Sequence, residues 1–103
     1  MTTPAYIIFE AEVTDPEGYE EYRRLAGAAV EQYGARYVVR GGRSRVLEGD
    51  WRPGRMVIVE YESFEKALAF YESPEYRRAR EARAATARVN MVVVEGLPSQ
   101  PGE

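Results

Sequence analysis

The sequence predicts an α+β fold in which helices cover one face of a four-stranded antiparallel sheet. Strand-like patterns occur near both ends of the chain, at residues 5–13 and 89–95. Two helical patterns that begin at proline separate these strands from the middle of the chain. The middle, residues 36–62, reads as two strands joined by a long connection punctuated with glycine. The resulting order of strand, helix, strand, strand, helix, strand (βαββαβ) is that of a ferredoxin-like unit.

The first strand and the first helix are defined by local signals. Residues 5–13 place four apolar side chains on one face, which we assign to the core: Ile7, Phe9, Ala11 and Val13. Asp15 supplies an N-cap acceptor, Pro16 suits the first helical turn, and Glu17 is favourable at the positive helix end. Tyrosine and alanine then recur at helical spacing, and Gly34 is expected to end the helix.

The two central strands flank the glycine-rich connection. Residues 37–40 predict a short strand, and Gly41-Gly42 predicts a β-bulge or a turn. Residues 46–48 are expected to continue this strand beyond the bulge, before a loop at residues 49–54. Residues 56–61 carry five apolar side chains in six positions, which is typical of a strand in the interior of a sheet.

Two N-cap signals divide the second helical region. Ser63 predicts a helix start, and the expected buried stripe of that helix is Phe64, Ala67, Leu68 and Tyr71. Ser73-Pro74-Glu75 repeats the cap, proline and acid pattern, so the helix is expected to break there and restart over residues 74–85. We expect a single domain over residues 1–96 and a flexible C-terminal tail over residues 97–103.

The composition excludes several kinds of chemistry. The 103 residues include no cysteine and no histidine, which removes thiolate nucleophiles, most zinc sites and the commonest general base. We therefore expect no metal, haem or other cofactor. The net charge of -3 argues against a nucleic-acid partner. No apolar run is long enough for a membrane span and the first residues lack a signal-peptide pattern, so a cytoplasmic protein is expected.

Both faces of the predicted sheet are apolar. Whichever alternating set of residues faces the helices, the other set still presents residues such as Ile8 and Ile58, or Val57 and Val59. An exposed apolar face of this extent is typical of an association site. We therefore expect a homodimer in which two sheets pack face to face as a dimeric α/β barrel.

Glu10 and Glu60 are the candidate catalytic residues. They lie on strands that are expected to be neighbours, together with Glu95. If these acids share a face, they raise one another's pKa and leave one of them as a proton-transfer group. The same acids can instead form an ion-pair network at the rim of the dimer, with a salt bridge from Arg40 to Glu60 across the hairpin.

A ligand is expected at one open end of the space between the sheet and its helices. Arg40 is the expected contact for an anionic group, because the adjacent glycines allow a ligand to approach the backbone. The other candidate ligand-binding residues are Tyr22, Trp51, Tyr71, Arg83 and Asn90. Tyrosines at helical spacing are more often core residues, and Trp51 can equally be a lid or a dimer contact.

Motifs spread along the chain resemble those of a known bacterial family. They are Asp15-Pro16 with Tyr19 and Tyr22, Arg40-Gly41-Gly42, Leu47-Glu48-Gly49 with Trp51 and Pro53, Glu60 with Ser63 and Ala67, Ser73-Pro74-Glu75-Tyr76, and Val94-Glu95-Gly96. This set is similar to the small family catalogued as domain of unknown function thirteen-thirty. The resemblance implies a ferredoxin-like dimeric α/β barrel with no established activity. Members often carry a histidine where this chain has Glu10, a difference that affects any chemistry needing an imidazole there.

These features are consistent with functions of different classes. The first is a protein that binds or transforms a small aromatic or anionic molecule without metal or haem. The second is a non-catalytic module that binds a ligand or another protein. A cofactor-free monooxygenase is a further alternative, because such enzymes resemble this chain in using Asn, Trp and Tyr around a phenolic substrate, and the chain has Asn90, Trp51 and eight tyrosines.

Overall fold

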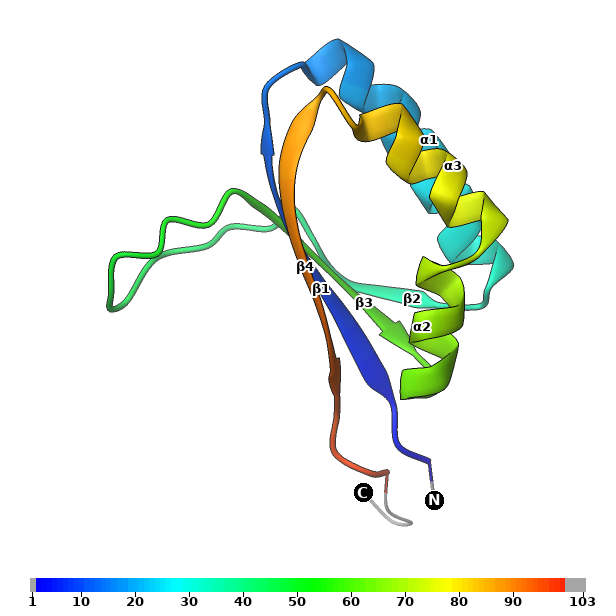
Figure 1. Ribbon diagram of the computed structural model, residues 1–103. Coiled ribbons are helices and arrows are strands. Elements are labelled where there is room, and N and C mark those ends of the chain that lie inside the picture. The colour runs from blue at the N-terminus through cyan, green and yellow to red at the C-terminus, as the bar shows by residue number, and fades with distance from the viewer. Residues whose placement is uncertain (1, 100–103) are drawn as a thin grey trace.

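The computed structural model describes residues 2–99 and has the predicted order of elements (Figure 1). The second helical region is divided in two at Ser73-Pro74, as the sequence predicts. The elements are β1 (Ala5–Val13), α1 (Pro16–Gln32), β2 (Arg36–Arg40), β3 (Arg55–Tyr61), α2 (Phe64–Tyr71), α3 (Pro74–Arg83) and β4 (Ala87–Glu95).

The four strands form one antiparallel sheet in the order β2-β3-β1-β4. All three helices lie on the same side of this sheet, and the other side is uncovered (Figure 1). In the middle of the sheet Phe9 is opposite Val57 on one neighbour and Met91 on the other. The sheet of a single chain is open, so closing a barrel requires strands from another molecule.

The core lies between the helices and the covered face of the sheet. The face of β1 that the sequence assigns to the core faces the helices, with Ile7, Phe9 and Ala11 all buried. From the helical side the core receives Tyr19, Tyr22, Ala26, Ala29, Val30, Ala67, Phe70, Tyr76 and Ala79. Stacked and edge-to-face contacts join the aromatic rings, for example Phe70 with Tyr61 and with Tyr76.

The three predicted N-caps are present. The Asp15 carboxylate accepts from the Gly18 amide at 3.2 Å, and the hydroxyls of Ser63 and Ser73 accept from the Lys66 and Tyr76 amides at 3.1 Å each. Each bond satisfies one amide that the first helical turn leaves without a partner. Local sequence therefore sets the start of every helix.

The connection between β2 and β3 differs from the expectation. β2 ends at Arg40, and residues 46–48 do not continue it. The irregularity in strand pairing falls between Tyr37 and Val39 rather than at Gly41-Gly42. Gly41 adopts a φ of 70° and donates to Met56 O at 2.8 Å, after which the chain leaves the sheet. Residues 41–54 form a long arm that projects from the side of the sheet away from the helices (Figure 1).

The buried side of α2 also differs from the predicted stripe. Phe70 is only 2% exposed, whereas Leu68 is 41% exposed. The helix places Ala67 and Phe70 against the core, three residues apart, and this rotation carries Leu68 outward.

The ends of the chain lie beside one another at the edge of the sheet. The amide of Gly96 donates to Pro4 O at 2.8 Å, and the amide of Ser99 donates to Thr2 O at 2.6 Å. Of the tail expected to be flexible at 97–103, residues 100–103 lie outside the described residues. Within residues 2–99, none of the helices has the length and apolar content needed to cross a membrane.

Candidate functional site

A small cavity lies between the helices and the covered face of the sheet. Its volume is about 50 Å³. The walls are aromatic and aliphatic side chains from β1, β2, β3, β4, α1 and α3, together with Phe70 of α2. Three arginines, Arg23, Arg40 and Arg55, complete the lining, which includes no acidic side chain. This combination of apolar walls and a few polar groups is typical of a small-molecule site.

Tyrosine hydroxyls supply the other polar groups of the cavity. The hydroxyls of Tyr22 and Tyr76 are 2.7 Å apart and form a buried hydrogen bond. Tyr61 is 3% exposed, and its buried hydroxyl has no hydrogen-bond partner. Burial raises the pKa of both Tyr22 and Tyr61 far above the usual value of a phenol. These tyrosines are therefore neutral groups that can donate or accept a hydrogen bond.

Two of the cavity arginines are positioned from the edge of the sheet. The Arg40 guanidinium lies 4.1 Å from the centre of the Tyr37 ring, in a cation–π contact. The Arg55 guanidinium lies directly over Gly41, where a Cβ atom would clash with it. Arg40 and Arg55 form no ion pair within residues 2–99.

Glu10 lies on the uncovered face of the sheet and anchors the arm. One carboxylate oxygen accepts from the Gly54 amide at 2.7 Å, and the other accepts from the Asn90 side chain at 2.9 Å. The Gly54 bond, and then the Asn90 bond, lower the pKa of Glu10 below its ordinary value. A carboxylate held in this way is ionised at neutral pH and acts as a structural acceptor.

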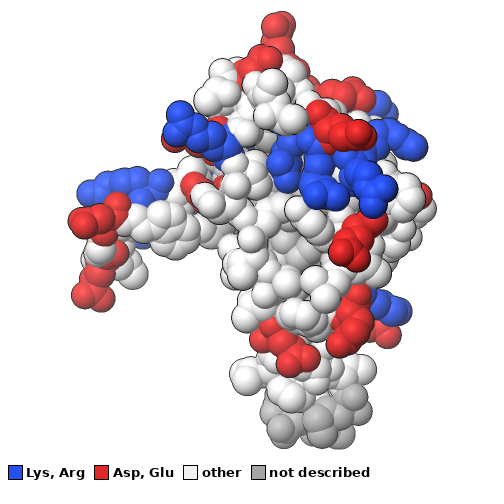
Figure 2. Space-filling view, viewed as in Figure 1, with Lys and Arg blue, Asp and Glu red and all other residues white. Residues whose placement is uncertain are grey.

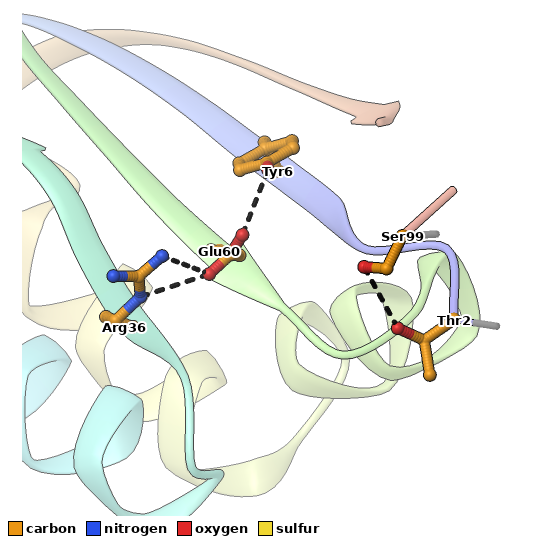
Figure 3. A network of polar contacts seen from close by, with 5 residues as sticks. All are labelled: Thr2, Tyr6, Arg36, Glu60 and Ser99. Carbon is orange, nitrogen blue, oxygen red and sulfur yellow. Dashed lines mark hydrogen bonds and ion pairs between the residues drawn. The ribbon is translucent and has the colours of Figure 1, made fainter. Parts of the chain in front are cut away.

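Glu60 belongs to a second polar cluster on the same face (Figure 3). It accepts from the Arg36 guanidinium, at 2.6 and 3.0 Å, and from the Tyr6 hydroxyl at 2.9 Å. Arg36, and then Tyr6, lower the pKa of Glu60. The expected salt bridge from Arg40 to Glu60 is wrong: Arg36 is opposite Glu60 in the sheet, whereas Arg40 is opposite Val57 on the helical side.

The expectation that the glutamates raise one another's pKa is also wrong. Glu10 is opposite Met56 on β3, four residues before Glu60, so the two acids are about 13 Å apart along the strand. Glu95 is opposite Ala5, whose side chain is buried on the helical face, and so it does not share a face with the other two acids. Hydrogen-bond donors, rather than other acids, surround Glu10 and Glu60.

The structure does not bring the predicted ligand-binding residues into one place. Tyr22 and Arg40 line the cavity, and Arg83 lies beside it, with its guanidinium 5.3 Å from the centre of the Tyr22 ring. Tyr71 lines a separate hollow near Leu68, where its hydroxyl accepts from Arg80 at 3.0 Å.

Trp51 and Asn90 lie together on the uncovered face, in an open hollow with Glu10. The separation has a simple cause: alternate residues of a strand point to opposite faces, and the arm that carries Trp51 projects away from the helices. The Asn, Trp and Tyr combination considered for a monooxygenase therefore does not line the cavity as one group within this chain.

Sequence reasoning missed several residues of the cavity. Arg55 and Tyr61 belong to the same alternating set as Val57 and Val59, which faces the helices. That alternation is visible in the sequence, but only the pairing with β1 shows which set is covered. Tyr76 was recognised only as a buried contact of α3. Within residues 2–99 no cluster of three acidic side chains could hold a metal ion.

Comparison with known proteins places this geometry in context. The model of a family described as a domain of unknown function, DUF1330, matches residues 4–97. No curated protein matches the sequence.

Solved structures with the same fold come from several organisms. A protein of unknown function from Rhodopseudomonas palustris has 21% identity and a TM-score of 0.75, over 96% of this chain and 86% of its own. A dimeric protein of unknown function with a ferredoxin-like fold, from Bacteroides fragilis, has 12% identity and a TM-score of 0.58, over 90% and 95%. SnoaB, a cofactor-independent oxygenase from Streptomyces nogalater, has 12% identity and a TM-score of 0.54, over 98% and 99%. At these identities the likeness shows the fold alone.

Proposed function

The chain belongs to the family of the domain of unknown function DUF1330, as its motifs predicted, and we propose that it binds a small organic molecule in the cavity between its sheet and its helices. The observation that supports this proposal is the lining of the cavity. Aromatic walls, buried tyrosine hydroxyls and arginines without acidic partners lie together at one site. A core that served only for packing would not need cations at its edge.

Filling the cavity tests this function without removing a polar group. Ala26 lines the cavity from α1, and Ala28 of the same helix is exposed. We expect a library of small aromatic and organic acids to contain compounds that raise the Tm of the wild-type protein. At ten times its Kd a ligand adds about 1.4 kcal/mol of stability, which raises the Tm by roughly 6 to 11 °C. Ala26→Leu should abolish the shift, because its side chain occupies the space.

The matched control is Ala28→Leu, which adds the same atoms to the solvent side of α1. It should keep the full ligand-dependent shift. If no compound stabilises the wild-type protein, or if the two variants respond equally, the cavity is not a binding site. That result would favour the alternative function, a module that interacts with other proteins.

A second copy of the chain is the partner that we propose for the uncovered face of the sheet. Val38, Val92 and Val94 on this face are all at least 45% exposed. The chain exposes 7215 Å² in total, whereas a compact monomer of this length exposes about 5,900 Å². The excess of about 1,300 Å² is more than the roughly 800 Å² that each partner contributes to a standard interface. The dimeric relative from Bacteroides fragilis has the same fold.

The arm contributes to the same proposed interface. It projects from the uncovered side of the sheet, so it lies beside any molecule that packs there (Figure 1). Leu47 and Trp51 on the arm are exposed apolar residues, 87% and 61% exposed. Acidic and basic side chains are also present on the projecting arm (Figure 2). In a two-fold dimer each arm would contact the other subunit.

A further inference from the structure

The cavity has an unbalanced positive charge at its edge. Of its three arginines, Arg23 is paired with Glu20 at 3.1 Å. Arg40 and Arg55 have no carboxylate partner within residues 2–99, although the rest of the surface is rich in acids. Arg40 is opposite Val57, and Arg55 precedes Val57 by two residues on the same face of the sheet. The two guanidinium groups are therefore diagonal neighbours at one edge of the cavity.

The backbone around these arginines is shaped to hold them there. Gly41, which follows Arg40, leaves the space that the Arg55 guanidinium occupies. Gly27 of α1 faces Arg40: a Cβ atom at that position would lie 3.8 Å from Arg40 Nη2. Two like charges held side by side repel, and the repulsion grows as the site is closed to water. An anion between them removes this repulsion, and two planar guanidinium groups suit a planar carboxylate.

A second polar group of the cavity also has no partner. The Tyr61 hydroxyl is buried and makes no hydrogen bond, and Tyr61 lines the cavity. A buried hydroxyl without a partner is destabilising, and such groups are rare in folded proteins. Between the arginines and Tyr61 the lining is apolar, with Val57 and Val59 on the same strand.

We propose that the ligand of this cavity is a small organic carboxylate, whose anionic group binds Arg40 and Arg55 and whose apolar body extends toward the Tyr61 hydroxyl. A polar atom at the far end of the ligand would pair with that hydroxyl. This inference rests on the proposed function and specifies its ligand class. It predicts discrimination by charge, which a merely apolar cavity would not show.

Matched probes of equal size test the charge. Binding of 4-hydroxybenzoate and of its neutral amide, 4-hydroxybenzamide, is measured by calorimetry and by thermal shift at matched ionic strength. We expect the carboxylate to bind at least roughly tenfold more tightly, because a charge-assisted hydrogen bond is worth more than a neutral one. Arg40→Met and Arg55→Met should each weaken the carboxylate by roughly tenfold or more and leave the amide unchanged. Arg78→Met, on the exposed surface of α3, is the control and should change neither.

The far end of the site is tested by removing one oxygen from each partner. In the wild-type protein 4-hydroxybenzoate should bind more tightly than benzoate, and Tyr61→Phe should remove that difference. Equal binding of the carboxylate and the amide, with both abolished by Ala26→Leu, would overturn the anion assignment and leave the proposed function intact. Failure of every probe to bind would overturn both. Inorganic phosphate binding as tightly as the carboxylates would show an adventitious anion site and would overturn the ligand class.

Discussion

At the scale of single residues, Ser73 has a larger structural role than the other helix caps. Its hydroxyl accepts from the Tyr76 amide at 3.1 Å and donates to Phe70 O at 2.7 Å, and the residue is only 5% exposed. It joins the end of α2 to the start of α3, close to the ring contact between Phe70 and Tyr76. Ser63 is less buried and makes only the capping bond.

The predicted consequence is a difference between two equivalent substitutions. Ser63→Ala should lower the free energy of unfolding by about 1 kcal/mol, the usual value for an N-cap. Ser73→Ala should lower it by about 2 kcal/mol, because it also leaves a buried carbonyl without its donor. Urea denaturation of both variants measures the difference. Equal losses would show that the bond to Phe70 O contributes nothing, and neither variant should alter ligand affinity.

At the scale of elements, the arm is attached to the sheet through a side chain of β1. Glu10 binds the Gly54 amide, and Gly54 lies so close to the backbone of Ala11 that a Cβ atom there would clash. The pKa of Glu10 is lower in the folded protein than its ordinary value. The stabilisation from Glu10 is therefore complete above the ordinary pKa of a glutamate and is lost as the pH falls through the lower folded value.

This attachment predicts an acid-induced change in the arm. Trp51 is the only tryptophan and lies in the arm, so its fluorescence reports on the environment of the arm. In the wild-type protein we expect the emission to change below about pH 4, when Glu10 becomes protonated. Glu10→Gln should remove this transition. Glu12→Gln, which removes an acid from the same strand, is the control and should retain it; loss of the transition in both variants would contradict the assignment.

At the scale of the whole molecule, the uncovered sheet face determines the assembly. A charge placed in this face should cost several kcal/mol of association, because it is buried without a partner in the dimer. Ile58 lies on this face opposite Ile8, and Val92 is 56% exposed there in a single chain. A charge at Val92 therefore has little effect on the folding of one chain, and its effect reports on association.

We expect the wild-type protein to sediment as a dimer at micromolar concentration. Ile58→Asp and Val92→Asp should both sediment as monomers, with Val92→Asp retaining the circular dichroism of the folded chain. Ala28→Asp, which places the same charge on the exposed side of α1, should remain dimeric. A soluble wild-type monomer at this concentration, or dimers that persist in all three variants, would exclude the sheet face as the interface.

Local patterns in the sequence determined the order of the elements, the three helix caps, the break at Ser73-Pro74 and the buried face of β1. Each depends on neighbouring residues, because capping bonds and side-chain alternation act within a few positions. Within the candidate site, the same reasoning found Tyr22 and Arg40, which line the cavity.

Only the tertiary structure decided which set of alternating residues on β3 faces the helices. A shift of one residue in strand register moves every side chain to the other face, and the sequence alone does not give the register. The pairing of β3 with β1 and β2 placed Arg55 and Tyr61 at the cavity and Glu60 beside Arg36 on the opposite face. The departure of the arm after Gly41 likewise depends on where strand pairing stops, and it carried Trp51 away from Tyr22 and Arg40.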